Sequence, residues 1–157
     1  MTTAIVAVAS AVLMEPAAAL LHRAVMHRRG WAWHRSHHRS GGRRGLERND
    51  LYPVVLAATT VGFMVVASLA GANLAVWAGV GVTAYGLAYL AVHDLCIHER
   101  CGPAFRARGW YLRWVAESHG IHHRTGAAPY GFLCPIVPRT SVAFSGADTR
   151  ARVEKTS

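Results

Sequence analysis

All ten histidines of this 157-residue chain fall into four short clusters that repeat one pattern. The first half of the chain holds H-x4-H followed by H-x2-H-H, and the second half holds the same two patterns in the same order. The residues concerned are His22, His27, His34, His37, His38, His93, His98, His119, His122 and His123. Imidazole is the commonest metal ligand among side chains. A repeat that uses every histidine therefore predicts one site built by both halves of the chain, most simply for more than one metal ion.

The two spacings have different consequences on a helix. In H-x2-H-H the histidines stand at i, i+3 and i+4, so each cluster should form an inward-facing trio whose members are close enough to share ligands. In H-x4-H, five residues advance a regular helix by about 140° beyond a full turn, so one face cannot present both imidazoles to one ion. The spacing predicts that the helix ends or bulges near His22–His27 and near His93–His98, or that the two side chains of a pair reach different ions.

Four carboxylates are candidates to orient the ligand imidazoles by accepting their free N–H groups. Asp94 directly follows a histidine and is the first candidate, while Glu99 and Glu117 lie within or beside the clusters. Glu15 lies in an apolar run about two helical turns before His22, too far away to join it as a ligand. An ionisable group in such a run is a functional candidate. Its partner is open between another helix and the second nitrogen of a histidine, and a plain position near a membrane interface is the alternative.

The charged and apolar residues are segregated along the chain. Over half of the residues (52%) are hydrophobic, yet the net charge is +9. No Lys or Arg occurs between Asp50 and His93, whereas residues 23–48 hold eight arginines. Basic blocks that adjoin long apolar runs are typical of membrane topology and argue against nucleic-acid binding. The runs long enough to span a bilayer, or nearly so, are residues 2–21, 54–70 and 74–92.

Three crossings would bring both basic blocks and all four histidine clusters to one side of the membrane. The first run lacks the positive N-terminal charge of a signal peptide, so we expect a retained span. The positive-inside rule then places the histidines at the cytoplasmic face, of the inner membrane if the chain is bacterial. The amphipathic segment Trp110–Val115 is expected to lie in the interface, although a fourth crossing is not excluded.

The sequence therefore predicts an all-α fold, an integral membrane helical bundle of three to four spans with a cytoplasmic histidine-rich cap. Residues 1–138 should form the membrane domain. Residues 139–157 are small and polar without periodicity, so we expect a disordered tail.

Four segments carry a family resemblance: ALLHRAVMHRRGWAWHRSHH, AVHDLCIHER, ESHGIHH and YGFLCP. Over about residues 10–135 they resemble the bacterial β-carotene 3-hydroxylases. These enzymes belong to the integral-membrane hydroxylase superfamily, which also acts on fatty acids and sterols. The resemblance implies that all ten histidines are metal ligands and that no other residue is directly catalytic.

The resemblance also implies a reaction and its cofactors. A non-haem di-iron centre would use O2 and two electrons to hydroxylate C3 of each β-ionone ring, taking β-carotene through cryptoxanthin to zeaxanthin. Hydroxylating an unactivated C–H bond needs a redox metal, which zinc is not, although zinc can occupy the site in a purified sample. Electrons would come from a separate ferredoxin-like protein, since no flavin, haem or dinucleotide motif is found. The oligomeric state stays open.

Three alternative functions remain. The same chemistry could act on another lipid, such as a sterol or fatty acid, or the enzyme could be a carotene ketolase. A membrane metal-binding protein without enzymatic activity is the alternative from a different class. A transporter would place its ligands within the spans, whereas these histidines gather beyond the ends of the apolar runs.

Overall fold

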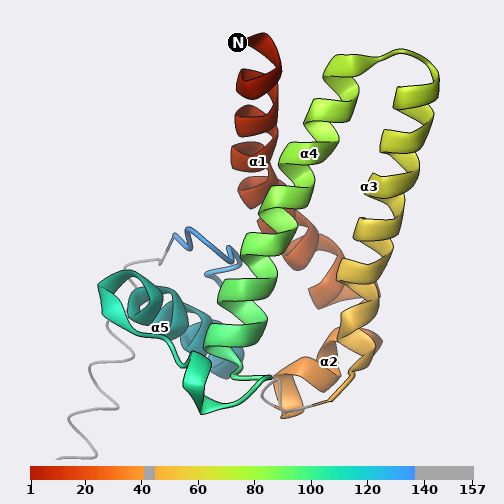
Figure 1. Cartoon of the computed structure of the whole chain (residues 1–157). Helices are drawn as coiled ribbons and strands as arrows, with labels where there is room; N and C mark the ends of the chain where they lie inside the picture. Colours follow the sequence, from red (N-terminus) through yellow and green to blue (C-terminus); the bar gives the residue numbers. More distant parts are fainter. Residues whose placement is uncertain (41–44, 137–157) are drawn as a thin grey trace, which may run out of the picture.

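The structure is a computed structural model that describes residues 1–40 and 45–136 (Figure 1). The described residues form helices and connecting turns, with no strand among them, which confirms the predicted all-α fold class. The expected disordered tail, residues 139–157, lies outside the described residues. In chain order the elements are α1 Thr2–Leu21, η1 His22–Arg29, α2 Trp31–Ser40, η2 Arg48–Asp50, α3 Leu51–Leu69, α4 Asn73–Tyr89, η3 Leu90–Ile97, η4 Pro103–Phe105 and α5 Gly109–Thr125.

Three continuous helices in the described part of the chain are long and apolar enough to cross a membrane. They are Thr2–Arg29, Arg48–Leu69 and Asn73–Ile97. Only 0%, 11% and 17% of the residues in their apolar windows are buried within the protein. Apolar side chains that face outward over whole helices need a lipid environment rather than water. The three spans expected from the sequence are therefore present, and each continues further toward the histidines than the apolar runs suggested.

The helix α4 is the centre of the bundle, because it packs against α1 on one side and α3 on the other (Figure 1). Two glycines of α4 permit these contacts. A Cβ at Gly81 would collide with the backbone carbonyl of Ala7 in α1, and a Cβ at Gly79 would collide with Met64 in α3. Small residues at such crossings let helix backbones approach closely, as is common in membrane bundles.

The helices α2 and α5 lie at one end of the bundle, opposite the N-terminus and the turn between α3 and α4 (Figure 1). This is the arrangement that three crossings require. The segment Trp110–Val115 belongs to α5, which lies across the end of the bundle. The histidines of α2 and α5 are thereby brought to the ends of the helices that begin with α1 and α4.

The elements η1 and η3 are π-helices that continue α1 and α4 without a break. Their backbone hydrogen bonds span five residues, from Gly30 N–H to Val25 O (2.8 Å) and from His98 N–H to His93 O (3.0 Å). Both lie where H-x4-H spacing predicted a helix end or bulge, so that prediction is confirmed. Such π-turns are rare and occur frequently at functional sites.

Candidate metal centre

The histidines converge into two neighbouring groups. In each group the candidate ligand nitrogens all lie within 4.8 Å of one another. The first histidine group consists of His22, His27, His34, His38 and His122, and the second of His37, His93, His98 and His119. Most of these rings are buried, down to 0% exposure for His122 and 1% for His22, His37 and His93. Two sets of buried imidazoles at this spacing are what a two-metal site requires.

Each π-turn brings two histidines into one group. The ring centroids of His22 and His27 are 4.9 Å apart, and those of His93 and His98 are 4.6 Å apart. A regular α-helix would point side chains five residues apart in clearly different directions. The extra residue in each π-turn restores a common face. Of the two alternatives left by the sequence, the structure shows the bulge, with both histidines of each pair in the same group.

The H-x2-H-H trios point inward as expected, but each is divided between the two groups. In α2, His34 and His38 join the first group and His37 joins the second. In α5, His122 joins the first group and His119 the second. The sequence spacing could not reveal this division, because all three positions lie on the same helix face.

His123 lies between the two groups. Its ring stacks on that of His38, with centroids 4.4 Å apart and planes at 17°, and lies equally close to that of His119 (4.4 Å). Its Nε2 is buried and has no hydrogen-bond partner. The atom is therefore available as a further nitrogen ligand between the groups.

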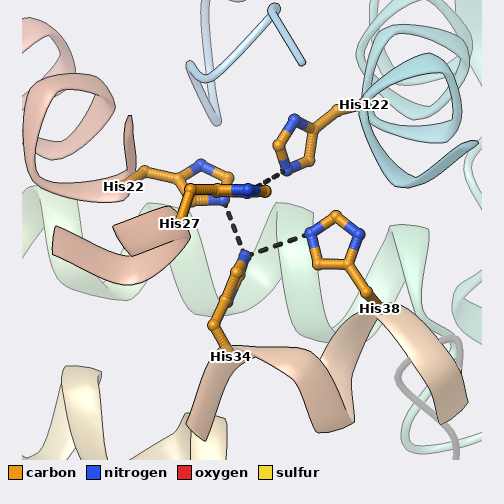
Figure 2. A group of neighbouring side chains, drawn as sticks. All are labelled: His22, His27, His34, His38 and His122. Atoms are coloured by element: carbon orange, nitrogen blue, oxygen red, sulfur yellow. Dashed lines mark hydrogen bonds between the residues drawn. The ribbon is translucent and has the colours of Figure 1, made fainter. Parts of the chain in front are cut away.

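The five rings of the first group point toward one another (Figure 2). On their outer sides, hydrogen bonds fix which ring nitrogen carries the proton. The Nδ1–H groups of His22, His34 and His122 donate to Tyr130 O (3.0 Å), Asn49 Oδ1 (2.7 Å) and Ala127 O (2.7 Å). These oxygens can only accept, so the Nε2 atom of each neutral ring keeps its lone pair. All three Nε2 atoms face other imidazoles of the group.

Opposed lone pairs in the first group fit a metal ion. The Nε2 atoms of His22 and His34, which both keep a lone pair, are 3.0 Å apart. Two neutral Nε2 lone pairs repel each other unless a cation lies near both. Two nitrogens bound at about 2.1 Å to one ion, at right angles, would be about 3.0 Å apart. The donor set and its spacing therefore fit a first-row metal ion.

The second group has the same organisation. His93 Nδ1–H donates to Asp94 Oδ1 at 2.7 Å, while its Nε2 is buried without a hydrogen-bond partner. The Nε2 of His37 is also buried and unpaired, and its Nδ1 lies 3.7 Å from Glu47 Oε2. The Nε2 atoms of His98 and His119 are 3.0 Å apart. Buried nitrogens without a proton partner on the inner side again fit a metal ion.

The protein environment keeps the histidines outside the apolar helices neutral. Burial is the largest cause, and it lowers the pKa of His34 to about 4 and that of His122 to about 3. Burial also lowers the pKa of His123 to about 2, and repulsion from His38 adds to the effect. Only neutral imidazole binds a metal ion, so these shifts favour ligation over protonation.

Asp94 holds an imidazole as the sequence suggested, but Glu99 and Glu117 do not. Glu99 accepts a hydrogen bond from Arg106 Nε at 2.7 Å. The Glu117 side chain is exposed. Proximity in sequence misled for both residues, because Glu99 follows the end of η3 and Glu117 lies on the outer face of α5. Glu15 does contact another helix, through Tyr85 of α4, and its remaining contacts are with backbone amides rather than with a histidine.

Two partners of the histidines were missed from the sequence. Asn49 of η2 is buried and accepts from His34, and Glu47 is the carboxylate nearest to the Nδ1 of His37. Both residues lie in a polar stretch that reads as a loop before α3. A capping box between Glu47 and Asp50 fixes that stretch. No histidine-centred motif includes either residue, so spacing alone could not have found them.

Comparison with known proteins relates the chain to membrane hydroxylases. The family model described as fatty acid hydroxylase matches residues 7–140. The chain is 37% identical over 138 residues to a β-carotene hydroxylase of Pseudescherichia vulneris, covering 85% of this chain and 77% of that protein. It is 41% identical over 125 residues to one of Pantoea ananas, covering 76% and 70%. For chloroplastic β-carotene 3-hydroxylase 1 of Arabidopsis thaliana the identity is 38% over 135 residues, covering 82% and 43%. No solved structure matches the chain significantly.

Proposed function

The chain belongs to the fatty acid hydroxylase family, and on that premise we propose that it hydroxylates a carotenoid at a pair of iron ions. The substrate class is supported by relatives whose names are β-carotene hydroxylase. The observation that carries the proposal is the pairing of two buried imidazole groups at one end of three apolar helices. At the end of the apolar helices, a hydrocarbon substrate could arrive from the bilayer and an electron donor from the water.

The two histidine groups would each hold one iron ion, with His123 a tenth ligand between them. The outward hydrogen bonds to Asn49, Asp94 and the backbone carbonyls keep the rings oriented with Nε2 inward. When bound, the iron pair would supply the redox chemistry with O2 that a zinc ion lacks. Asp94 would also offset part of the ions' positive charge.

The reaction proposed is the replacement of C–H by C–OH at C3 of a β-ionone ring. One atom of O2 enters the product and the other leaves as water, which consumes two electrons and two protons. A separate ferredoxin-like protein would supply the electrons. Repetition at the second ring would convert β-carotene through cryptoxanthin to zeaxanthin.

The aromatic ring of Phe132 lies against one histidine of each group. Phe132 stacks on His22 (centroids 4.8 Å apart, planes at 15°) and meets Tyr89 edge-on at 4.9 Å. It also contacts His93 edge-on at 5.4 Å. This side of the site excludes water and suits a hydrocarbon ring. We further propose that the histidine end faces the cytoplasm, because η1 and α2, which together hold five arginines, lie at that end.

The test is expression in a host that accumulates β-carotene, together with a redox donor. Chromatography should detect cryptoxanthin and zeaxanthin, and His122→Ala should yield neither. Keto-carotenoids would indicate a ketolase. Unchanged carotene despite folded, iron-loaded protein would sink the proposal, and a screen of sterols and fatty acids would then identify another lipid substrate.

A further inference from the structure

Glu15 joins the apolar helix α1 to a segment more than a hundred residues later. Its Oε1 accepts hydrogen bonds from the backbone N–H groups of Phe132 (2.9 Å), Leu133 (3.1 Å) and Cys134 (2.9 Å). Its Oε2 accepts from Tyr85 OH at 2.7 Å and also from Leu133 N–H at 3.1 Å. Three successive amides that converge on one carboxylate form a nest for an anion. The oxygens of a carboxylate only accept hydrogen bonds, so the three N–H groups and the Tyr85 hydroxyl all find an acceptor in Glu15.

A carboxylate in an apolar helix is costly, so its contacts need an explanation. A packing role would be filled equally well by leucine or methionine. Tyr85 alone would satisfy only part of the acceptor capacity. The rest of this capacity is filled by the three amides. They belong to the segment Tyr130–Cys134, which has no regular secondary structure of its own. A charged acceptor is the means by which α1 can hold an irregular segment in one place, since hydrogen bonds to charged groups are about twice as strong as neutral ones.

The same segment contacts both histidine groups. The carbonyl of Tyr130 accepts the Nδ1–H of His22, in the first group. The ring of Phe132 stacks on His22 and meets His93, in the second group, edge-on. A movement of the segment would therefore displace one imidazole of each group.

We propose that Glu15 is a positioning residue that fixes the segment Tyr130–Cys134 and, through it, the rings of His22 and His93. This inference rests on the proposed function only in treating these two rings as metal ligands. Glu15 itself touches neither a histidine nor the position of a metal ion. Its effect is on where Nε2 of each ring points, and hence on the geometry of both ions' sites.

The first test is amide hydrogen exchange of the full chain in lipid nanodiscs, without substrate. Glu15→Gln keeps the size of the side chain but replaces one acceptor oxygen with a donor. We expect the amides of Phe132–Cys134 to exchange about tenfold faster or more, given the usual strength of hydrogen bonds to charged groups. Exchange in α3 should be unchanged, which distinguishes a loosened segment from a destabilised fold. If the amides of Phe132–Cys134 exchange in Glu15→Gln at the same rate as in the wild type, the proposal is overturned.

A second variant reaches the same contact from the other side. A Cβ at Gly131 would lie 2.6 Å from Glu15 Oε1, so Gly131→Ala should push the carboxylate out of its nest while leaving its charge in place. It should therefore loosen the same amides even if Glu15→Gln does not fold.

Two control variants complete the set. Tyr85→Phe removes one donor and leaves the three amides, so its effect should be smaller, and Thr83→Val removes a hydroxyl that bonds only within α4 and should change nothing.

The link to the histidines is tested with Co²⁺ as a spectroscopic probe. In Glu15→Gln the visible absorption of the Co²⁺-loaded protein should shift, and release of Co²⁺ to a chelator should be about tenfold faster or more, as for other losses of support behind a ligand. Thr83→Val should match the wild type in both measurements. Faster segment exchange with an unchanged Co²⁺ spectrum would overturn the link. Failure of the wild type to hydroxylate carotene would refute the proposed function and leave these readouts intact.

Discussion

His22 and His27 are separated by four residues, yet their ring centroids lie 4.9 Å apart in the same histidine group. The cause is the π-turn of η1, which the hydrogen bond from Gly30 N–H to Val25 O closes. The same relationship joins His93 to His98 through η3. The H-x4-H motif is therefore a π-helical motif in this chain, and the proposed metal site would depend on the π-turn.

Moving one histidine by a single position tests that dependence. The double variant Met26→His/His27→Met converts H-x4-H into the H-x3-H spacing that suits a regular helix. Adjacent residues of a helix point about 100° apart, so a histidine at position 26 would not point where His27 does. We expect metal content, measured by mass spectrometry of the purified protein, to fall by about one ion per chain. Full metal content would show that the π-turn is not needed.

Removing the partner of His93 should weaken the second site. Asp94 accepts the Nδ1–H of His93 at 2.7 Å, so Asp94→Ala removes the hydrogen bond that orients that ring. Loss of such a partner typically lowers metal affinity or activity about 10- to 100-fold. Titration with Co²⁺ in competition with a chelator measures the change. Glu117→Gln, in an exposed carboxylate of α5, is the control and should bind like the wild type; equal loss in both variants would refute a specific role for Asp94.

The division of the trios predicts two separable metal sites. His37→Ala removes a ligand of the second group and His122→Ala a ligand of the first. Each variant should lose hydroxylation completely, because the reaction needs both ions. Each should nevertheless retain about one ion per chain, since the other group is intact. Retained activity in either variant would contradict a shared centre, and loss of both ions would contradict separable sites.

The metal-free protein should become less stable as the pH falls. Burial holds the pKa of His34 at about 4 and that of His122 at about 3 in the folded protein, whereas unfolded histidine has a pKa of 6.5. Between pH 6.5 and about 4 the unfolded chain binds more protons, so the free energy of unfolding decreases on acidification. The slope is at most about 1.4 kcal/mol per pH unit for each such histidine.

Unfolding of chelator-treated protein in mixed micelles, at pH 7.5 and pH 5, measures this loss of stability. His34→Ala should show a smaller loss, because one histidine no longer contributes. A free energy of unfolding that is the same at both pH values would contradict buried, neutral imidazoles.

Periodic features of the sequence were enough to predict the three long apolar helices and the convergence of the histidines. The apolar runs predicted three helices, and the H-x4-H spacing predicted the two bulges, because each depends on local geometry alone. The division of the H-x2-H-H trios depends on how α2 and α5 cross the other helices. The spacing of histidines along one helix face does not show which of the two groups each histidine joins.

The carboxylates show the same limit. Asp94 was predictable because its partner is the adjacent residue. The structure does not bring Glu99 and Glu117 to a histidine, because sequence proximity does not determine which way a side chain points. Glu99 pairs with Arg106, and the Glu117 side chain is exposed. The cost of Glu15 in an apolar helix made it a functional candidate, but its partners in the segment Tyr130–Cys134 are brought to it only by the tertiary fold.

The central claim is that one chain holds two metal ions with imidazole nitrogens alone. The most direct measurement is the iron content and X-ray absorption spectrum of anaerobically reconstituted wild-type protein. We predict two iron ions per chain, each surrounded by nitrogen neighbours at about 2.1 Å. One ion or fewer per chain, or a ligand shell with sulfur from the cysteines, would contradict the account.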